Sequence, residues 1–321
     1  MSSITVLLVF AFLLLRGFDV CLSQGQLKVG FYSQTCPNAE SIVKSVVAKA
    51  TADDSSTPSV LLRLQFHDCF VQGCDGSILV DNERAAVEHN GVGGFDQIKT
   101  AKELIEAQCP GVVSCADIVA MAARDAVALA GGPAFEVETG RRDGKIAMAS
   151  LAAAIPDVKD SIGTLKSKFK GSGLSEKELV VLTGGGHTIG TTACFFVVDR
   201  LYNFTGRNIS DPSINPKFLP VLRRTCPKNG DASVRLQLDP ITGNSFDDQV
   251  FKNIKKGFSV LASDARLLDD VSTKKAVDFY RGEDDGSFAR DFAAAMVKMG
   301  RIGVKNSSQG EIRRACNAVN K

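Results

Sequence analysis

The chain lacks tryptophan altogether and has only three tyrosines and three histidines among its 321 residues. With so few histidines, a transition metal has few ways to bind through imidazole nitrogens. An excess of one charge is also absent, because 38 Lys and Arg stand against 36 Asp and Glu. Binding of nucleic acid requires a concentrated basic face, so the composition argues against such a partner.

Long hydrophobic runs are absent apart from residues 4–15, which end before Arg16 and are followed by Cys21-Leu22-Ser23. A membrane-spanning helix needs about 20 apolar residues, so this run is too short to span. We interpret residues 1–23 as a cleaved signal peptide, with a retained anchor as the alternative. Residues 24–321 are then expected to form one domain, secreted to the cell exterior and without a membrane span after cleavage.

Cysteine usage agrees with secretion. Nine cysteines are present, and removal of Cys21 with the signal peptide leaves an even set of eight. An even set in a secreted chain predicts four disulfides, although eight cysteines allow about 105 pairings. Three N-x-S/T sequons also suit a secretory protein and predict glycosylation, at Asn203, Asn208 and Asn306.

Apolar residues recur at helical spacing far more often than they alternate. Helices are predicted over residues 37–50, from a cap at Ser114 to Gly131, after a capping box of Ser175 and Glu178, and over residues 287–299. Only residues 135–139 alternate, which predicts a small hairpin at most. The sequence therefore predicts one mostly α domain, for which two lobes packed together are the simplest arrangement.

The most informative segment is residues 61–77, LLRLQFHDCFVQGCDGS. Arg63 and His67 are four residues apart, so on a helix they project from one face, with Phe66 beside them. A histidine can take a proton from a small polar substrate while an arginine stabilises the charge that develops. Taken alone, the pair also fits a structural interpretation, with a buried histidine and an ion-paired arginine.

A second histidine, His187, follows three glycines in LTGGGHTIG. Glycines allow a close backbone approach, which suits a histidine delivered to a flat ligand. A plain turn or a phosphate loop is the alternative, but the Walker lysine is missing.

Oxygen donors are concentrated after His67, at Asp68, Asp75 and Ser77. With the carbonyls of Val71 and Gly73, they suit Ca²⁺, which takes roughly six to eight oxygen ligands. A solvated acidic turn is the alternative. The spacing of an EF-hand is absent, and an oxidising compartment disfavours zinc at Cys69 and Cys74.

Both motifs, in this order and at this separation, resemble those of the class III secretory plant peroxidases, and the resemblance covers about residues 26–320. It implies a two-lobed, mostly α fold with one haem b between a distal and a proximal lobe. It also implies a monomer that reduces hydrogen peroxide and oxidises small phenolic or aromatic donors by one-electron steps.

The resemblance implies a role for each site residue. His67 is the base that moves the peroxide proton, Arg63 stabilises the separating charge, and Phe66 contacts the haem. On the proximal side, His187 is the iron ligand, and Asp264 in the segment SDARL accepts its other ring N–H. Further residues implied are the donor-site pair Pro156 and Phe196, and the internal ion pair of Asp117 and Arg141.

Two calcium ions per chain are implied as well. The first uses the cluster after His67; the second would use Thr188, Asp239, Thr242, the Ser245 carbonyl and Asp247. The resemblance also selects one disulfide pairing: Cys36 with Cys109, Cys69 with Cys74, Cys115 with Cys316, and Cys194 with Cys226.

The chain departs from the family pattern on the distal side. An asparagine six residues after a glutamate usually accepts the N–H of the distal histidine, but six residues after Glu83 stands His89, followed by Asn90. Ser56 replaces an arginine near a haem propionate. Gln65 replaces a histidine, which we interpret as a surface change or one behind the site.

These departures leave a second hypothesis open, a secreted, calcium-stabilised binding scaffold with weak or lost activity. A hydrolase is disfavoured, because His67 and Asp68 are adjacent and no G-x-S-x-G elbow occurs. With no tryptophan in the chain, and Leu238 before Asp239 where intracellular relatives have one, a tryptophan radical is excluded.

Overall fold

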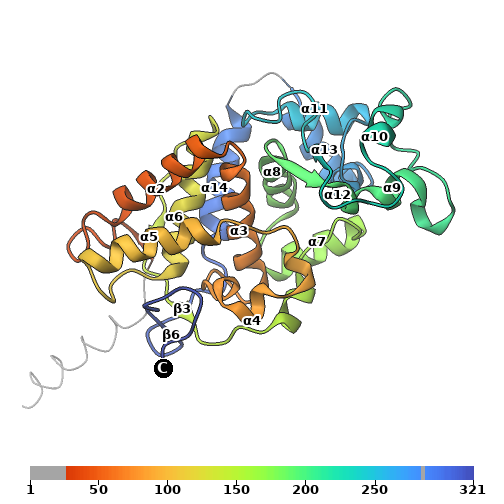
Figure 1. The fold of residues 1–321 in the computed structure, drawn as a ribbon. Helices are drawn as coiled ribbons and strands as arrows, with labels where there is room; N and C mark the ends of the chain where they lie inside the picture. The colour runs from red at the N-terminus through yellow and green to blue at the C-terminus, as the bar shows by residue number, and fades with distance from the viewer. Residues whose placement is uncertain (1–26, 283–285) are drawn as a thin grey trace, which may run out of the picture.

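The computed structural model describes residues 27–282 and 286–321, and these residues are mostly helical (Figure 1). The predicted signal peptide, with Cys21, lies outside the described residues. The α-helices are α2 (Ala39–Asp53), α3 (Thr57–Val71), α4 (Asp81–Arg84), α5 (Phe95–Gln108), α6 (Cys115–Leu129), α7 (Ile162–Gly171), α8 (Glu176–His187), α9 (Val198–Tyr202), α10 (Leu219–Thr225), α11 (Gln249–Lys256), α12 (Ala262–Arg266), α13 (Val271–Tyr280) and α14 (Ser287–Met299). Short 3₁₀ turns join several of them: η1 (Ser77–Leu79), η2 (Val87–His89), η3 (Ala149–Ala154), η4 (Cys194–Phe196) and η5 (Phe204–Gly206).

The predicted helix starts are confirmed at two caps. The Ser114 side chain accepts a hydrogen bond from the backbone N–H of Asp117 at the start of α6. At the start of α8, Ser175 and Glu178 make both hydrogen bonds of a capping box. These contacts satisfy backbone N–H groups that have no partner inside the helix, which fixes where each helix begins. The last helix begins and ends where the sequence predicts.

The predicted hairpin at residues 135–139 is wrong. Only β2 (Glu138–Thr139) is a strand there, and it pairs antiparallel with β1 (Lys28–Val29), near the start of the described chain. Two other short sheets occur in the described part, formed by β3 (Asp143–Gly144) with β6 (Gly310–Glu311), and by β4 (Thr191–Ala193) with β5 (Arg235–Gln237). Each pairing joins segments far apart in the sequence, which local alternation cannot predict.

Helix α3 lies between two hydrophobic cores. Leu61 and Leu64 pack into a core with α2, α5 and α6. Leu62 and Phe70, on another face, belong to a core built with α7, α8, α11, α13 and α14. Figure 1 shows α2, α5 and α6 on one side of α3 and α7, α8, α11 and α13 on the other. The two-lobed, mostly α architecture is therefore confirmed, and it places one face of α3 toward the second lobe.

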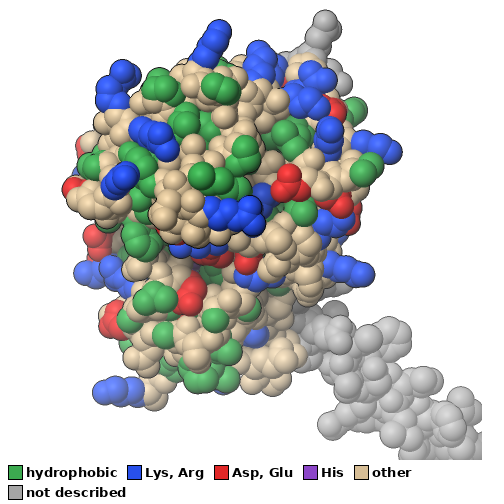
Figure 2. Space-filling view, turned by 90° about the vertical axis from the view of Figure 1, so that its right-hand side faces the viewer, with side chains coloured by type: hydrophobic (Ala, Val, Ile, Leu, Met, Phe, Trp, Pro, Cys, Tyr) green, Lys and Arg blue, Asp and Glu red, His purple; other side chains and the backbone are tan. Residues whose placement is uncertain are grey.

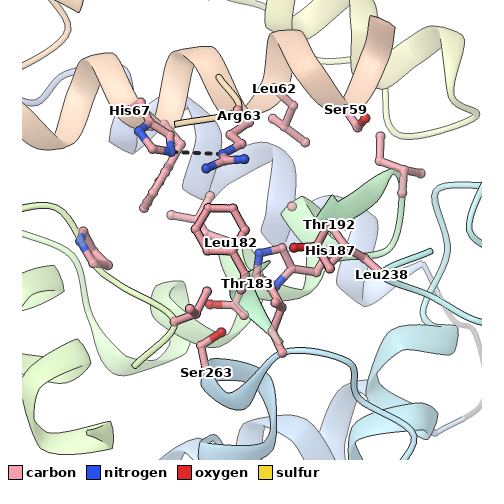
Figure 3. A pocket seen from close by; sticks show the side chains of 18 of the residues that line it. Ser59, Leu62, Arg63, His67, Leu182, Thr183, His187, Thr192, Leu238 and Ser263 are labelled. Carbon is pink, nitrogen blue, oxygen red and sulfur yellow. Dashed lines mark hydrogen bonds between the residues drawn. The ribbon is translucent and has the colours of Figure 1, made fainter. Parts of the chain in front are cut away.

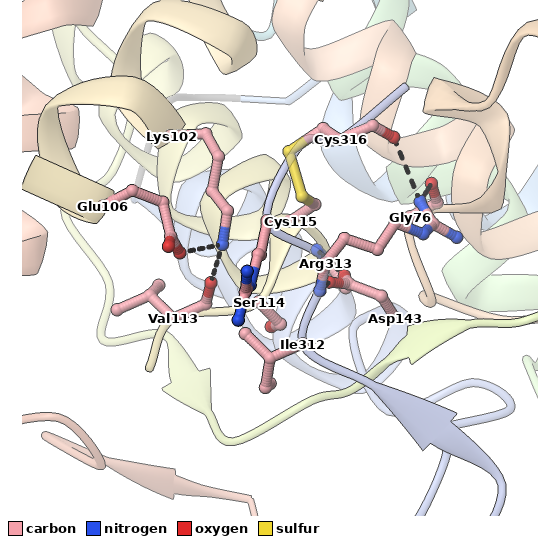
Figure 4. The surroundings of a disulfide bond; sticks show 12 residues. Gly76, Lys102, Glu106, Val113, Ser114, Cys115, Asp143, Ile312, Arg313 and Cys316 are labelled. Atoms are coloured by element: carbon pink, nitrogen blue, oxygen red, sulfur yellow. Dashed lines mark hydrogen bonds and ion pairs between the residues drawn. A yellow bond between two sulfur atoms is a disulfide. The ribbon is translucent and has the colours of Figure 1, made fainter. Parts of the chain in front are cut away.

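Four disulfides connect distant segments. They join the pairs that the resemblance implies: Cys36–Cys109, Cys69–Cys74, Cys115–Cys316 and Cys194–Cys226. The bond between Cys115 and Cys316 holds the C-terminal segment against the start of α6, as Figure 4 shows. Beside it, the fully buried Arg313 donates to the carbonyls of Gly76 and Gly144.

Other buried charges are structural. Arg141 donates to Asp117 over 2.8 Å, and both side chains are almost fully buried. Arg141 also donates to the carbonyl of Gly300, so it ties α6 to the end of α14. This confirms the predicted internal ion pair.

Within the described residues, no helix has the length and apolar character needed to cross a membrane. On the face drawn in Figure 2, lysine and arginine side chains are scattered among acidic and hydrophobic ones. That face lacks the concentrated basic surface that phosphate backbones require.

Candidate active site

A cavity of about 470 Å³ lies between α3 and the C-terminal end of α8 (Figure 3). Its volume is in the range of small-molecule and cofactor sites. Arg63, Phe66 and His67 line one side from α3, and His187 lines the other. Most of the remaining lining is apolar, with contributions from Leu62, Leu165, Phe169, Leu179, Phe292 and Met296.

On the α3 side, Arg63 and His67 meet as their spacing predicts. The Nε of Arg63 donates to the Nε2 of His67 over 3.1 Å. The ring of Phe66 stands edge-on to that of His67, with centroids 5.6 Å apart. The side chain of Arg63 also lies 5.8 Å from the ring of Phe196, and it donates to the carbonyl of Asn90 over 3.3 Å. Arginine and imidazole are therefore held together at the cavity wall.

Burial keeps His67 neutral. Desolvation, followed by the charges of Arg63 and His89, holds the pKa of His67 well below its ordinary value. Burial and the nearby Arg235 also lower the pKa of the Arg63 guanidinium, which nevertheless stays charged. At neutral pH the site therefore offers an unprotonated imidazole beside a fixed cation, which is the arrangement that general base catalysis needs.

The other ring nitrogen of His67 is in contact with His89, not with Asn90. The Nδ1 atoms of His67 and His89 are 3.0 Å apart, and both rings are buried. The Nε2 of His89 lies 3.9 Å from the Oε1 of Glu83. Asn90 is exposed, and its contact with the site is through its backbone carbonyl.

On the opposite wall, His187 ends α8 and is bonded to Asp264. Its Nδ1 is 2.7 Å from the Oδ1 of Asp264, which is buried and also receives the Ser263 hydroxyl over 3.3 Å. With Nδ1 held in this way, Nε2 is the nitrogen available to a group in the cavity. A carboxylate partner of this kind fixes the tautomer of a metal-ligating histidine and raises its basicity.

The three glycines before His187 have different roles. A Cβ on Gly184 or Gly185 would overlap the rings of Phe251 and Phe292, respectively. These two glycines thus allow α8 to pack closely on α11 and α14. Gly186 alone lines the cavity. The expectation that glycines permit close approach to a flat ligand therefore applies to one of the three.

Two buried carboxylate oxygens in the segment that follows His67 lack hydrogen bonds. Asp68 and Asp75 are almost fully buried, and neither Oδ1 of Asp68 nor Oδ2 of Asp75 has a hydrogen-bond partner within the described residues. The nearest cation to Asp75 is Lys305, whose Nζ is 3.5 Å from Oδ2. Burial, and then the charge of Asp75, raise the pKa of Asp68 well above its usual range. Oxygens so placed fit a bound cation, because buried charges are normally paired.

A second group of oxygen donors lies beside His187. The Thr188 hydroxyl is 2.9 Å from the carbonyl of Asp247 and 3.4 Å from that of Ser245. Thr242 donates to Asp247, and the buried Oδ2 of Asp239 lacks a hydrogen-bond partner in the described part of the chain. Each group has only two carboxylates, and the described residues contain no cluster of three or more His, Cys, Asp or Glu arranged for a metal. Hydroxyl and carbonyl oxygens make up the remaining donors, as suits calcium.

Other predicted residues are also located. Pro156, Phe196 and Ser56 line the cavity. Gln65 is buried, so the interpretation as a surface change is wrong, and it does not line the cavity. Sequence reasoning missed Arg235, which lines the cavity from β5 and donates to Thr191 on β4. Its place depends on a pairing of distant strands, so no local signal reveals it.

Similarity of the sequence to known proteins agrees with this geometry. The family model described as Peroxidase matches residues 43–283. Peroxidase 43 of Arabidopsis thaliana is 55% identical over 307 residues, which cover 93% of this chain and 94% of that protein. Peroxidase N1 of Nicotiana tabacum is 47% identical over 325 residues, covering 99% and 98%. The chain therefore belongs to the peroxidase family, among the class III peroxidases of plants.

Proposed function

We propose that this peroxidase is a secreted enzyme that holds one haem b in the cavity between α3 and α8. It reduces hydrogen peroxide and oxidises small phenolic or aromatic donors by one-electron steps. The proposal rests on two hydrogen-bonded pairs on opposite sides of one cavity. Arg63 and His67 form the pair on α3, and His187 and Asp264 form the pair on the other wall. Steady-state oxidation of a phenol by the purified holoprotein tests it, and no peroxide-dependent oxidation would contradict it.

The residues present fit a haem. His187 would hold the haem iron through Nε2, with Asp264 as its positioning partner, and Phe66 lies on the cavity wall. Largely apolar walls suit a flat, mostly apolar ring system. When bound, the haem iron supplies the site at which peroxide is cleaved and electrons from the donor are received.

The chain's own residues supply the proton chemistry. The Nε2 of His67 takes a proton from hydrogen peroxide and returns it to the leaving oxygen, which departs as water. Arg63 stabilises the negative charge that develops as the O–O bond lengthens. Pro156 and Phe196, at the same cavity, are the proposed contacts for the aromatic donor.

Two calcium ions are proposed in the two oxygen-donor groups. The first uses Asp68, Asp75 and Ser77 with the carbonyls of Val71 and Gly73, and the second uses Thr188, Asp239, Thr242 and Asp247 with the carbonyl of Ser245. Asp68 follows His67, and Thr188 follows His187, so each ion would fix the backbone beside one histidine.

Removal of calcium is expected to destabilise the protein. Chelation leaves buried carboxylates uncompensated, and breaking a buried charge pair typically costs about 3–5 kcal/mol. Thermal unfolding of the holoprotein, followed by circular dichroism with chelator and with calcium restored, measures the effect. Restoration with magnesium is the control, because Mg²⁺ demands a tighter octahedral site. An unchanged melting temperature on chelation would contradict both calcium assignments.

Secretion is proposed from the signal-like N-terminus and the four disulfides, which persist in oxidising compartments. Residues 1–23 would be removed, leaving 24–321 as the mature domain, which we propose to be monomeric. Asn203 and Asn208 are exposed, and Asn306 is partly exposed, so the three sequons are proposed glycosylation sites.

The alternative of an inactive scaffold is not favoured. That alternative assumes that His67 has no hydrogen-bond acceptor for its other ring N–H, because the usual asparagine is missing. His89 takes the place of the asparagine, 3.0 Å from the Nδ1 of His67.

A further inference from the structure

The contacts of His67 determine which of its nitrogens carries a proton. The Nε of Arg63 has only a hydrogen to offer, and it lies 3.1 Å from the Nε2 of His67. A guanidinium has no lone pair to accept with, so Nε2 must be the acceptor and carries no proton. Neutral His67 therefore carries its proton on Nδ1.

The contact between the two histidines then determines the state of His89. Two Nδ1 atoms 3.0 Å apart share one hydrogen, because two N–H groups facing each other would repel. Since His67 donates from Nδ1, the Nδ1 of His89 accepts. Neutral His89 therefore carries its own proton on Nε2, the nitrogen that faces Glu83.

Glu83 favours the same tautomer from the far side. Its Oε1 lies 3.9 Å from the Nε2 of His89, and both side chains are completely buried. This separation exceeds a hydrogen bond, so the carboxyl oxygen favours a proton on the facing Nε2 of His89 only through its lone pairs. Neither the Nε2 of His89 nor the Oε2 of Glu83 has another hydrogen-bond partner within the described residues. The Ser77 hydroxyl donates to Glu83 over 3.3 Å and helps to hold the carboxylate in place.

The backbone around His89 is built to hold this arrangement. His89 ends the turn η2, where its N–H donates to the carbonyl of Ala86 over 3.0 Å. Gly91 follows with φ of +77°, a conformation that favours glycine, as the chain turns away and the preceding carbonyl of Asn90 bonds to Arg63. The same short segment thus supplies one partner to each of the two distal residues.

We propose that His89 is the positioning residue of the distal base: it accepts the Nδ1 proton of His67 and so keeps Nε2 free to take the proton of peroxide. The inference rests on the proposed function. When Nε2 gains that proton, His67 becomes an imidazolium and its bond to His89 becomes charge-assisted, which strengthens it at the moment of proton uptake. The hydrogen between the two Nδ1 atoms stays in place. The proton gained at Nε2 returns to the leaving oxygen, which departs as water.

Nitrogen NMR of the wild-type protein tests the tautomers without relying on activity. Histidine labelled with ¹⁵N gives signals from only three rings, and the iron is replaced by diamagnetic zinc in the porphyrin. We expect His67 protonated on Nδ1, His89 protonated on Nε2, and a ¹⁵N–¹⁵N coupling between the two Nδ1 atoms through the hydrogen bond. A proton on the Nδ1 of His89 in the neutral state, or absence of this coupling, would overturn the proposal.

Kinetics of three variants test the positioning role. His89→Leu removes the acceptor and is expected to slow the reaction of the holoprotein with peroxide by roughly 10- to 100-fold, by analogy with the loss of the partner that orients a metal-bound histidine. His89→Asn supplies an amide oxygen as acceptor and should restore most of the rate. Val87→Ala, at an exposed position of the same turn, should leave the rate unchanged.

The outcomes separate this inference from the proposed function. An active wild type with an equally active His89→Leu variant would refute the role of His89 alone. Equal losses in His89→Leu and His89→Asn, both with normal haem absorption, would also refute it, because the acceptor would then be irrelevant. Absence of peroxide turnover in the wild type would instead refute the proposed function, while the NMR measurement would still test the histidine pair.

Discussion

Replacement of His67 by leucine is expected to slow the reaction with hydrogen peroxide by roughly 10²- to 10⁴-fold, the usual contribution of a general base. Haem binding should be unchanged, because the proposed axial ligand, His187, lies on the opposite wall. The physical reason is that His67 is the neutral imidazole beside Arg63, with its pKa held below the ordinary value by burial. Stopped-flow mixing of the variant holoprotein with peroxide measures the rate.

The pH dependence provides a further check on the same residue. Because the pKa of His67 is lowered, the unprotonated base persists as the pH falls through the ordinary histidine value. The wild-type rate should therefore decline only at lower pH, as His67 becomes protonated, and the variant should lack this decline. A His67→Leu variant that reacts as fast as the wild type would rule out the base assignment.

Replacement of His187 by alanine is expected to abolish stable haem binding. The Nε2 of His187 is the proposed ligand to the iron, and the substitution removes that proposed bond. Asp264→Asn is the matched milder change, because it preserves size but removes the charge that orients His187 over 2.7 Å. Loss of such an outer partner typically costs roughly 10- to 100-fold in affinity or activity, and loss of the ligand should cost more.

Titration of each protein with haem, followed by absorption in the Soret region, measures this order. We expect the wild type to bind most tightly, Asp264→Asn to bind more weakly, and His187→Ala to give no stable complex. Normal haem binding by His187→Ala would contradict the axial role. Circular dichroism of the same samples would distinguish loss of haem from loss of the fold.

Local patterns predicted those parts of the site that local geometry fixes. Arg63 and His67 lie on one face because they are four residues apart on a helix, and the capping box at Ser175 fixes the start of α8. The partner of His187, by contrast, is far away in the sequence. Asp264 and the pairing of the disulfides were predicted through the family resemblance, since spacing alone leaves many pairings open.

The rest depended on tertiary contacts. The sequence left open whether His89 or Asn90 supports His67, because the two are adjacent and the turn η2 decides which side chain is buried. The hairpin at residues 135–139 was wrong because β2 pairs with a strand near the start of the described chain. Arg235 was missed for a similar reason, since it reaches the cavity through the pairing of β5 with β4.

The measurement that tests the central claim most directly is stopped-flow absorption of the purified wild-type holoprotein mixed with hydrogen peroxide. If His67, Arg63 and His187 act as proposed, the Soret band should change rapidly on mixing and return when a phenol is added. A Soret band that does not respond to peroxide would contradict an active distal site. Failure to form a Soret band with haem and calcium present would contradict the proposed haem site itself.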